Sequence, residues 1–186
     1  MMVMEKITFV TGNLNKVREL ENYLGVTVIQ KELALPEIQS LDVEEVAKIK
    51  AQKAYELLGV PALVEDTALT FLALGKLPGP FIKYFLESIQ NDGLVKLLNN
   101  FENREAVATT CFALADENGV QTFVGSAHGL VASEPRGEDK FGWDRIFIPV
   151  GYTQTWAEMS IEEKQKTSMR RKALDEFKSY LEIKQI

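Results

Sequence analysis

The chain has 186 residues, of which 46% are hydrophobic and 26% charged, and its net charge is −6 at pH 7. This size and composition predict a single globular domain, residues 1–186, with enough chain for a sizeable core. The acidic balance argues against a nucleic-acid-binding protein, although locally clustered cations can still bind a phosphorylated small molecule.

No stretch approaches the roughly 20 consecutive apolar residues of a membrane span, and the first residues lack the apolar region of a signal peptide. We therefore expect no membrane partner. The only cysteine, Cys111, excludes an internal disulfide, which fits a cytoplasmic location. Cys111 stands in an apolar run, so we interpret it as a core residue rather than a nucleophile.

The first third of the chain predicts strands that alternate with helices. Residues 7–10 and 26–30 are short runs typical of strands. Residues 14–24, between them, carry apolar side chains at helical spacing, and residues 43–58 predict a second amphipathic helix. A short buried strand is expected at residues 62–64.

A turn at Glu65 and Asp66 is predicted to end that strand. Helical patterns follow at residues 81–89 and 94–101, with a break at residues 91–93.

Two β-like runs, residues 105–115 and 120–132, follow in the second half of the chain. The Asp-Glu-Asn-Gly sequence between them is a strong hairpin signal. A polar loop leads from there to Phe141, and the chain is mainly helical from Ile161 onward. This order of elements predicts a mixed α/β fold with a central cleft.

The first candidate phosphate site is the Thr11-Gly12-Asn13 turn between the first strand and helix, with Lys16 one turn into the helix. Helix N-terminal amides carry unpaired donors and a partial positive charge, which suit phosphate. The pattern is not a Walker loop, and taken alone it is equally typical of an ordinary strand-to-helix turn.

Acidic residues form a second candidate site. Glu65 and Asp66 follow a buried strand, where unpaired carboxylates are costly and where ligands gather in α/β sheets. A magnesium ion that bridges to phosphate oxygens is a natural partner for them. A turn whose aspartate caps a helix is the alternative. Glu37, in a loop stiffened by Pro36, is a further acidic candidate.

Aromatic and basic residues in the last third are candidates for base recognition. Phe141, Trp143 and Asp144 combine two rings with a carboxylate that can accept from ring N–H groups. A packed β-turn explains the same residues. Residues 164–172 are rich in Lys and Arg, which predicts either a cationic site or a solvated helix face.

Taken together, these motifs resemble in order and spacing the inosine triphosphate pyrophosphatase family, which removes non-standard purine nucleotides. The resemblance covers residues 9 to 174, nearly the whole chain. The matching stretches are Phe9-Val10-Thr11-Gly12-Asn13-x-x-Lys16, Leu35-Pro36-Glu37, Leu63-Val64-Glu65-Asp66-Thr67, Leu77-Pro78-Gly79-Pro80, Phe141-Gly142-Trp143-Asp144, Ala157-Glu158-Met159, Lys164 and Ser168-Met169-Arg170.

The resemblance implies an elongated α/β fold in which helices flank a mixed sheet and two lobes surround a central cleft. Such proteins are commonly homodimers. The implied reaction is hydrolysis of ITP, dITP or XTP to the monophosphate and pyrophosphate, with Mg²⁺, or alternatively Mn²⁺, as cofactor.

Roles for individual residues also follow from the resemblance. Glu37 and Asp66 would hold Mg²⁺, Glu65 or Asp66 would orient or deprotonate the attacking water, and Lys16 would assist catalysis. The residues implied to bind substrate are Thr11, Gly12, Asn13, Lys16 and Lys50 at the triphosphate, and Phe141, Trp143, Asp144, Lys164, Ser168, Met169 and Arg170 at the base and sugar.

One residue departs from the family pattern: Met169 stands where the family has histidine. Methionine donates no hydrogen bond, so we expect the preference for 6-keto purines to be retained but weakened. Two alternatives remain open at this point. One is a Maf-like pyrophosphatase for other nucleotides, and the other is a nucleotide-binding module with impaired catalysis.

Overall fold

The N-terminal elements form a parallel β-α-β unit in the computed structural model, which describes residues 6–138 and 141–184. β1 (Lys6–Val10) pairs in parallel with β2 (Thr27–Lys31), and α1 (Leu14–Leu24) connects them. The apolar stripe of α1 packs against the β1 side chains. The two predicted strands and the predicted helix are confirmed.

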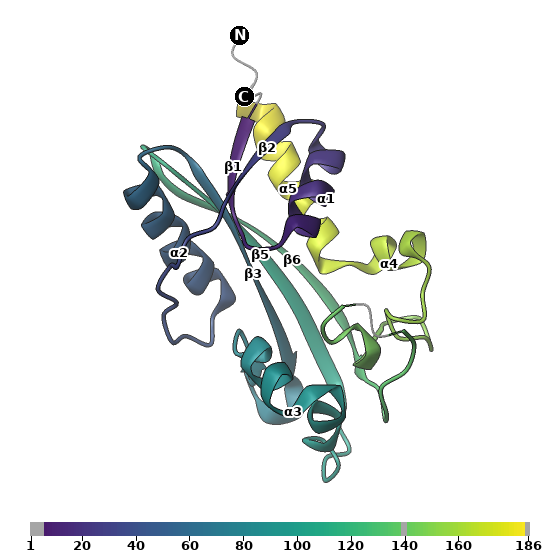
Figure 1. The fold of residues 1–186 in the computed structure, drawn as a ribbon. Helices are drawn as coiled ribbons and strands as arrows, with labels where there is room; N and C mark the ends of the chain where they lie inside the picture. The colour runs from purple at the N-terminus through teal and green to yellow at the C-terminus, as the bar shows by residue number, and fades with distance from the viewer. Residues whose placement is uncertain (1–5, 139–140, 185–186) are drawn as a thin grey trace.

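Long antiparallel strands form the spine of the molecule. β3 (Ala62–Phe71), β5 (Glu105–Asp116) and β6 (Gly119–Val131) pair over most of their lengths, which confirms the predicted hairpin. β4 (Pro78–Gly79) and β7 (Phe147–Pro149) are short additions. The seven strands of the described ranges form one mixed sheet in the order β2-β1-β3-β5-β6-β7, with β4 on β3. Figure 1 shows the long strands β3, β5 and β6 side by side.

The predicted turn at Glu65 and Asp66 is wrong, because both residues lie inside β3. Ten consecutive residue pairs join β3 to β5, from Ala62 opposite Ala115 to Phe71 opposite Ala106. Because β5 pairs with every residue of β3, the strand continues through the polar positions Glu65, Asp66 and Thr67. The alternative that Asp66 caps a helix is wrong for the same reason.

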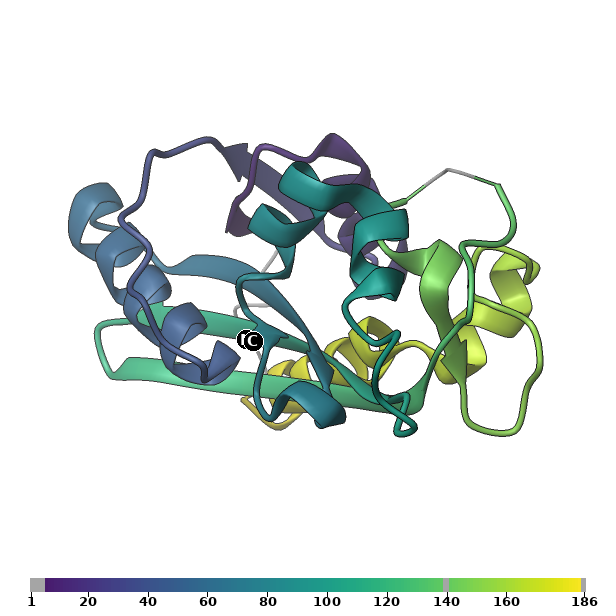
Figure 2. The ribbon, with the colours of Figure 1, turned by 90° about the horizontal axis from the view of Figure 1, so that it is seen from below.

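Helices cover the two faces of the sheet separately (Figures 1 and 2). α2 (Val43–Leu58) covers one face, where its buried alanines pack among β3 and β5 side chains that include Cys111. α1 and α5 (Met169–Lys184) cover the other face with a second apolar cluster. Cys111 is fully buried, and burial raises the pKa of its thiol to about 12, which suits the predicted core residue.

A second lobe lies at the far end of the long strands. It contains η1 (Leu72–Leu74), α3 (Ile82–Lys96) and η2 (Asp144–Ile146), while α4 (Ile161–Thr167) leads back to α5. The break predicted at residues 91–93 lies at Gln90, where the backbone leaves the helical conformation within α3. The elongated mixed sheet with flanking helices and two lobes is therefore as predicted. No helix of the described segments is long and apolar enough to cross a membrane.

Candidate functional site

A cleft of about 670 Å³ lies between the two lobes and receives side chains from both of them. One wall comes from β1, the loop that follows it, and the start of α5, while the other comes from α3 and the segment before η2. The predicted site residues that line it are Thr11, Gly12, Asn13, Lys16, Glu37, Lys50, Glu65, Asp66, Phe141, Trp143, Met169 and Arg170.

A gap in strand pairing opens β3 to this cleft. β5 pairs with the whole of β3, so the other strands share its second edge. On that edge β1 pairs only with Ala62 and Leu63, and β4 pairs only with Leu69 and Thr70. Among the described residues, no strand covers residues 64–68 there. Side chains from both faces of the sheet can therefore line a single cleft.

The loop after β1 is ordered by its own side chains. The backbone N–H of Asn13 donates to Thr11 Oγ1 at 3.1 Å. Asn13 Oδ1 in turn accepts from the backbone N–H of Asn15 at 3.0 Å and of Lys16 at 3.4 Å, and so caps α1. Two helix amides are thus already satisfied, and the side chains of Lys16 and Arg170 supply cations to this wall.

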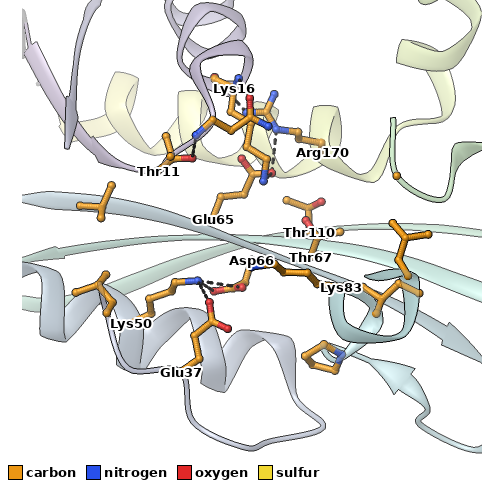
Figure 3. Close-up of a pocket in the computed structure, with 18 of the residues that line it drawn as sticks. Thr11, Lys16, Glu37, Lys50, Glu65, Asp66, Thr67, Lys83, Thr110 and Arg170 are labelled. Atoms are coloured by element: carbon orange, nitrogen blue, oxygen red, sulfur yellow. Dashed lines mark hydrogen bonds and ion pairs between the residues drawn. The ribbon is translucent and has the colours of Figure 1, made fainter. Parts of the chain in front are cut away.

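Lys50 joins two acidic residues on the α2 side of the cleft (Figure 3). Its Nζ lies 2.7 Å from Glu37 Oε1 and 3.1 Å from Asp66 Oδ2. Burial alone would lower the pKa of Lys50, but the charges of Asp66 and Glu37 outweigh burial and raise it. The hydrogen bond from Lys50 lowers the pKa of Glu37. Burial raises the pKa of Asp66, and Lys50 offsets only part of this effect.

Glu65 lies on the opposite side of β3, between Lys16 and Arg170 (Figure 3). Glu65 Oε1 is 3.1 Å from Lys16 Nζ and accepts from Arg170 Nε at 3.0 Å. Burial would raise the pKa of Glu65, but these two cations outweigh burial and lower it. Arg170 also forms an ion pair with Glu19 of α1, so the start of α5 is tied to both β3 and α1.

The predicted base end divides between the cleft and the core. Phe141 is 51% exposed, whereas Trp143 is 6% exposed and packs beside Trp156 with ring centroids 5.6 Å apart. Lys164 forms an ion pair with Asp144, and its Nζ lies 5.3 Å from the centre of the Phe141 ring. Burial raises the pKa of Asp144, and the charge of Lys164 opposes that rise.

Three predicted site residues do not line the cleft. Asp144 and Lys164 form their ion pair beside it, next to Phe141. Ser168 lies in a separate hollow of about 360 Å³, where its Oγ accepts from the backbone N–H of Arg171 at 3.3 Å. Met169 does reach the cleft, although its side chain is only 8% exposed and belongs to the apolar core.

Sequence reasoning missed two cleft residues of interest. Lys83, at the start of α3, brings a cation from the second lobe, and its charge helps to lower the pKa of Glu37. Its only sequence signal is its place just after the Leu77–Pro80 motif. Thr110 of β5 is fully buried, with a hydroxyl that has no hydrogen-bond partner among the described residues. An alternating strand pattern gives no sign of such a residue.

The acidic residues fit a magnesium ion that the substrate helps to hold. No group of three His, Cys, Asp or Glu side chains in the described ranges is placed to bind a metal ion. Mg²⁺, however, commonly takes only one or two carboxylates and completes its shell with water and substrate phosphates. Glu37 and Asp66 supply two carboxylates that converge on one point, as their shared contact with Lys50 Nζ shows.

Comparisons with a family model and with curated relatives agree with one another. The sequence model of the Ham1 family matches residues 7–180. Inosine triphosphate pyrophosphatase 2 of Trypanosoma cruzi is 48% identical over 179 residues, which are 94% of this chain and 91% of the relative. The dITP/XTP pyrophosphatase of Methanopyrus kandleri is 43% identical over 176 residues, or 92% of this chain and 94% of the relative.

A solved structure agrees. The HAM1 protein of Coxiella burnetii superposes with a TM-score of 0.84 at 28% identity, covering 96% of this chain and 98% of that one. The resemblance that the motifs indicated is thereby confirmed. The sequence and the fold together show that the chain belongs to the Ham1 family.

Proposed function

We propose that the chain hydrolyses non-standard purine nucleoside triphosphates, such as ITP, dITP and XTP, to the monophosphate and pyrophosphate. The relatives that it matches over most of their length are named for this activity. The observation that carries the proposal is the meeting of three lysines, Lys16, Lys50 and Lys83, with Glu37 and Asp66 in one cleft. Three cations suit a triphosphate, and the paired acids suit its metal ion.

We propose that water attacks a phosphorus atom, that its oxygen bonds to this phosphorus, and that pyrophosphate leaves. Lys16 and Lys83, which approach from opposite lobes, hold the triphosphate and stabilise its developing charge. Asp66 orients the water and accepts its proton. Glu37 and Asp66 would hold Mg²⁺, or Mn²⁺ in its place, and the bound ion would neutralise phosphate charge and lower the pKa of a bound water.

Base selection is proposed to depend on Lys164. Hypoxanthine and xanthine carry a 6-keto acceptor where adenine carries an amino donor. Asp144 holds the Lys164 ammonium beside the cleft, next to the exposed Phe141 ring that lines it. A base that stacks on this ring would bring its keto oxygen within reach of the ammonium. Adenine would set a donor against this donor. Such mismatches discriminate between substrates by roughly 10⁴-fold when the site is well enclosed.

A pyrophosphate-release assay across ITP, XTP, GTP, ATP and UTP, with and without a chelator, tests the proposal. We expect kcat/KM for ITP to exceed that for ATP by roughly 10²-fold or more, and the chelator to remove the activity. Equal rates on ATP would contradict the proposed selectivity. Preference for UTP would indicate a Maf-like enzyme, and binding without pyrophosphate release would indicate an impaired module.

Replacing Met169 with histidine is expected to raise the ratio of kcat/KM for ITP to that for ATP by several-fold. Met169 reaches the cleft but offers only a thioether, whereas imidazole adds a hydrogen-bond donor. Parallel kinetics on both nucleotides measure the ratio. Met159→His, at a partly buried position outside the residues that line the cleft, is the control. An unchanged ratio in Met169→His would mean that the side chain at this position takes no part in selection.

We also propose that the protein works as a cytoplasmic homodimer. The family resemblance supports the dimer, and the single buried thiol, Cys111, suits a reducing compartment. Light scattering on the purified protein tests the dimer, since the mass of one chain is 20.9 kDa. Fractionation of cells tests the location.

A further inference from the structure

Glu65 and Asp66 are neighbours in β3, yet their side chains point to opposite faces of the sheet (Figure 3). This follows from the alternation of side chains along a strand. Glu65 contacts Lys16 of α1 and Arg170 of α5, whereas Asp66 contacts Lys50 of α2. The gap in strand pairing at residues 64–68 lets both carboxylates border the cleft, but in different surroundings.

The two carboxylates differ in their exposure to solvent. The Glu65 side chain is 2% exposed, against 19% for Asp66. Glu65 Oε1 is shared between Lys16 Nζ at 3.1 Å and Arg170 Nε at 3.0 Å, while its Oε2 is shielded from solvent. A carboxylate enclosed in this way between two cations is poorly placed to receive a proton from water that enters the cleft. Asp66 is the better placed of the two.

The ion pair with Glu65 restricts the Lys16 side chain. A lysine stem has many rotamers, and holding its ammonium in one place costs conformational entropy. Its side chain is 24% exposed, and Glu65 is the acidic group with which it forms an ion pair in the described structure. Arg170 is also fixed by Glu65, with a further ion pair to Glu19. A cation fixed before the substrate arrives binds phosphate with a smaller entropy loss.

We infer that Glu65 is a positioning residue: it holds Lys16 and Arg170 at the cleft wall, where both cations meet the substrate, and it does not accept the proton of the attacking water. The inference rests on the proposed function and divides the roles of the two neighbouring acids. Asp66 serves the reacting end of the substrate. Glu65 acts on the substrate only through the cations that it holds.

A double-mutant cycle on the full-length protein tests this role. We expect Glu65→Gln to raise KM for ITP by about 10-fold and to lower kcat by less than about 10-fold, because most of the loss falls on binding and a smaller part on the developing charge that Lys16 stabilises. In the double variant Glu65→Gln/Lys16→Ala, the loss in kcat/KM should be at least about fivefold smaller than the product of the losses in the two single variants, since the two residues act together. Glu56→Gln, in the surface pair with Lys53, is the matched control and should leave both constants unchanged.

Two results would overturn the inference. One is a fall in kcat of about 10²-fold or more in Glu65→Gln with KM unchanged, as expected of a lost proton acceptor. The other is single losses that multiply in the double variant. If Glu65→Gln does not fold, Glu65→Asp replaces it in the same cycle, because it keeps the charge but withdraws the carboxylate from both cations. A wild-type protein that releases no pyrophosphate from ITP would instead overturn the proposed function.

Discussion

Asp66→Asn is expected to lower kcat for ITP by about 10³-fold while the protein remains folded. The asparagine amide cannot accept the proton of the attacking water, and it is a much weaker ligand for Mg²⁺ than a carboxylate. The fold should tolerate the change because the side chain keeps its shape. Burial already disfavours the charge of Asp66, and Lys50 keeps its contact with Glu37 at 2.7 Å.

Kinetics on ITP, together with circular dichroism and a thermal melt, measure both halves of this expectation. Asp92→Asn is the matched control, because Asp92 is an exposed acid on α3 outside the residues that line the cleft. Its kcat should equal that of the wild type. A near-normal rate in Asp66→Asn would remove Asp66 from the proposed mechanism.

Gly125→Ala is expected to destabilise the protein by about 3 kcal/mol and to lower its Tm by roughly 10 °C. Gly125 lies in β6 directly under the start of α5. A Cβ atom there would stand 2.0 Å from the carbonyl oxygen of Met169 and 2.5 Å from the backbone nitrogen of Ala173. Both contacts are backbone atoms, so a rotamer change cannot relieve them. The helix itself must move away from the sheet.

Such a movement would also reach the cleft, because Met169 and Arg170 start the same helix. We therefore expect KM for ITP to rise in the fraction of Gly125→Ala that stays folded. Thermal unfolding and steady-state kinetics measure the two effects. Gln121→Ala, at an exposed position of the same strand, is the control and should melt close to the wild type. A melting temperature within about 2 °C of the wild type in Gly125→Ala would contradict the close packing of α5 on β6.

The sequence predicted most of the elements, because their apolar patterns are local. The extent of β3 could not be predicted in this way. Its apolar run stops at Val64, and the acids that follow argue for a turn on local grounds. The strand continues because ten residues of β5 pair with it and because cations from α1, α2 and α5 surround the acids. These partners come from distant parts of the chain.

For the candidate site, too, the sequence predicted which residues take part but not the surroundings of each one. Twelve of the site residues that the motifs predicted line one cleft. Whether the rings of Phe141 and Trp143 are buried or exposed could not be predicted, since aromatic residues are common both in cores and at surfaces that stack on a ligand. Trp143 is buried because Phe147 and Trp156 pack around it, whereas Phe141 remains half exposed. Lys83 was missed because a single lysine at a helix start is common on protein surfaces.

The gap in strand pairing along β3 has a consequence for self-association. An open strand edge offers unpaired backbone groups to the strands of other molecules and so invites aggregation. Here the open edge is confined to residues 64–68 between β1 and β4, and two of these residues are Glu65 and Asp66. Charged side chains on a short edge discourage intermolecular strand pairing. The acids proposed to serve the nucleotide would therefore also keep a necessary opening in the sheet from becoming a site of aggregation.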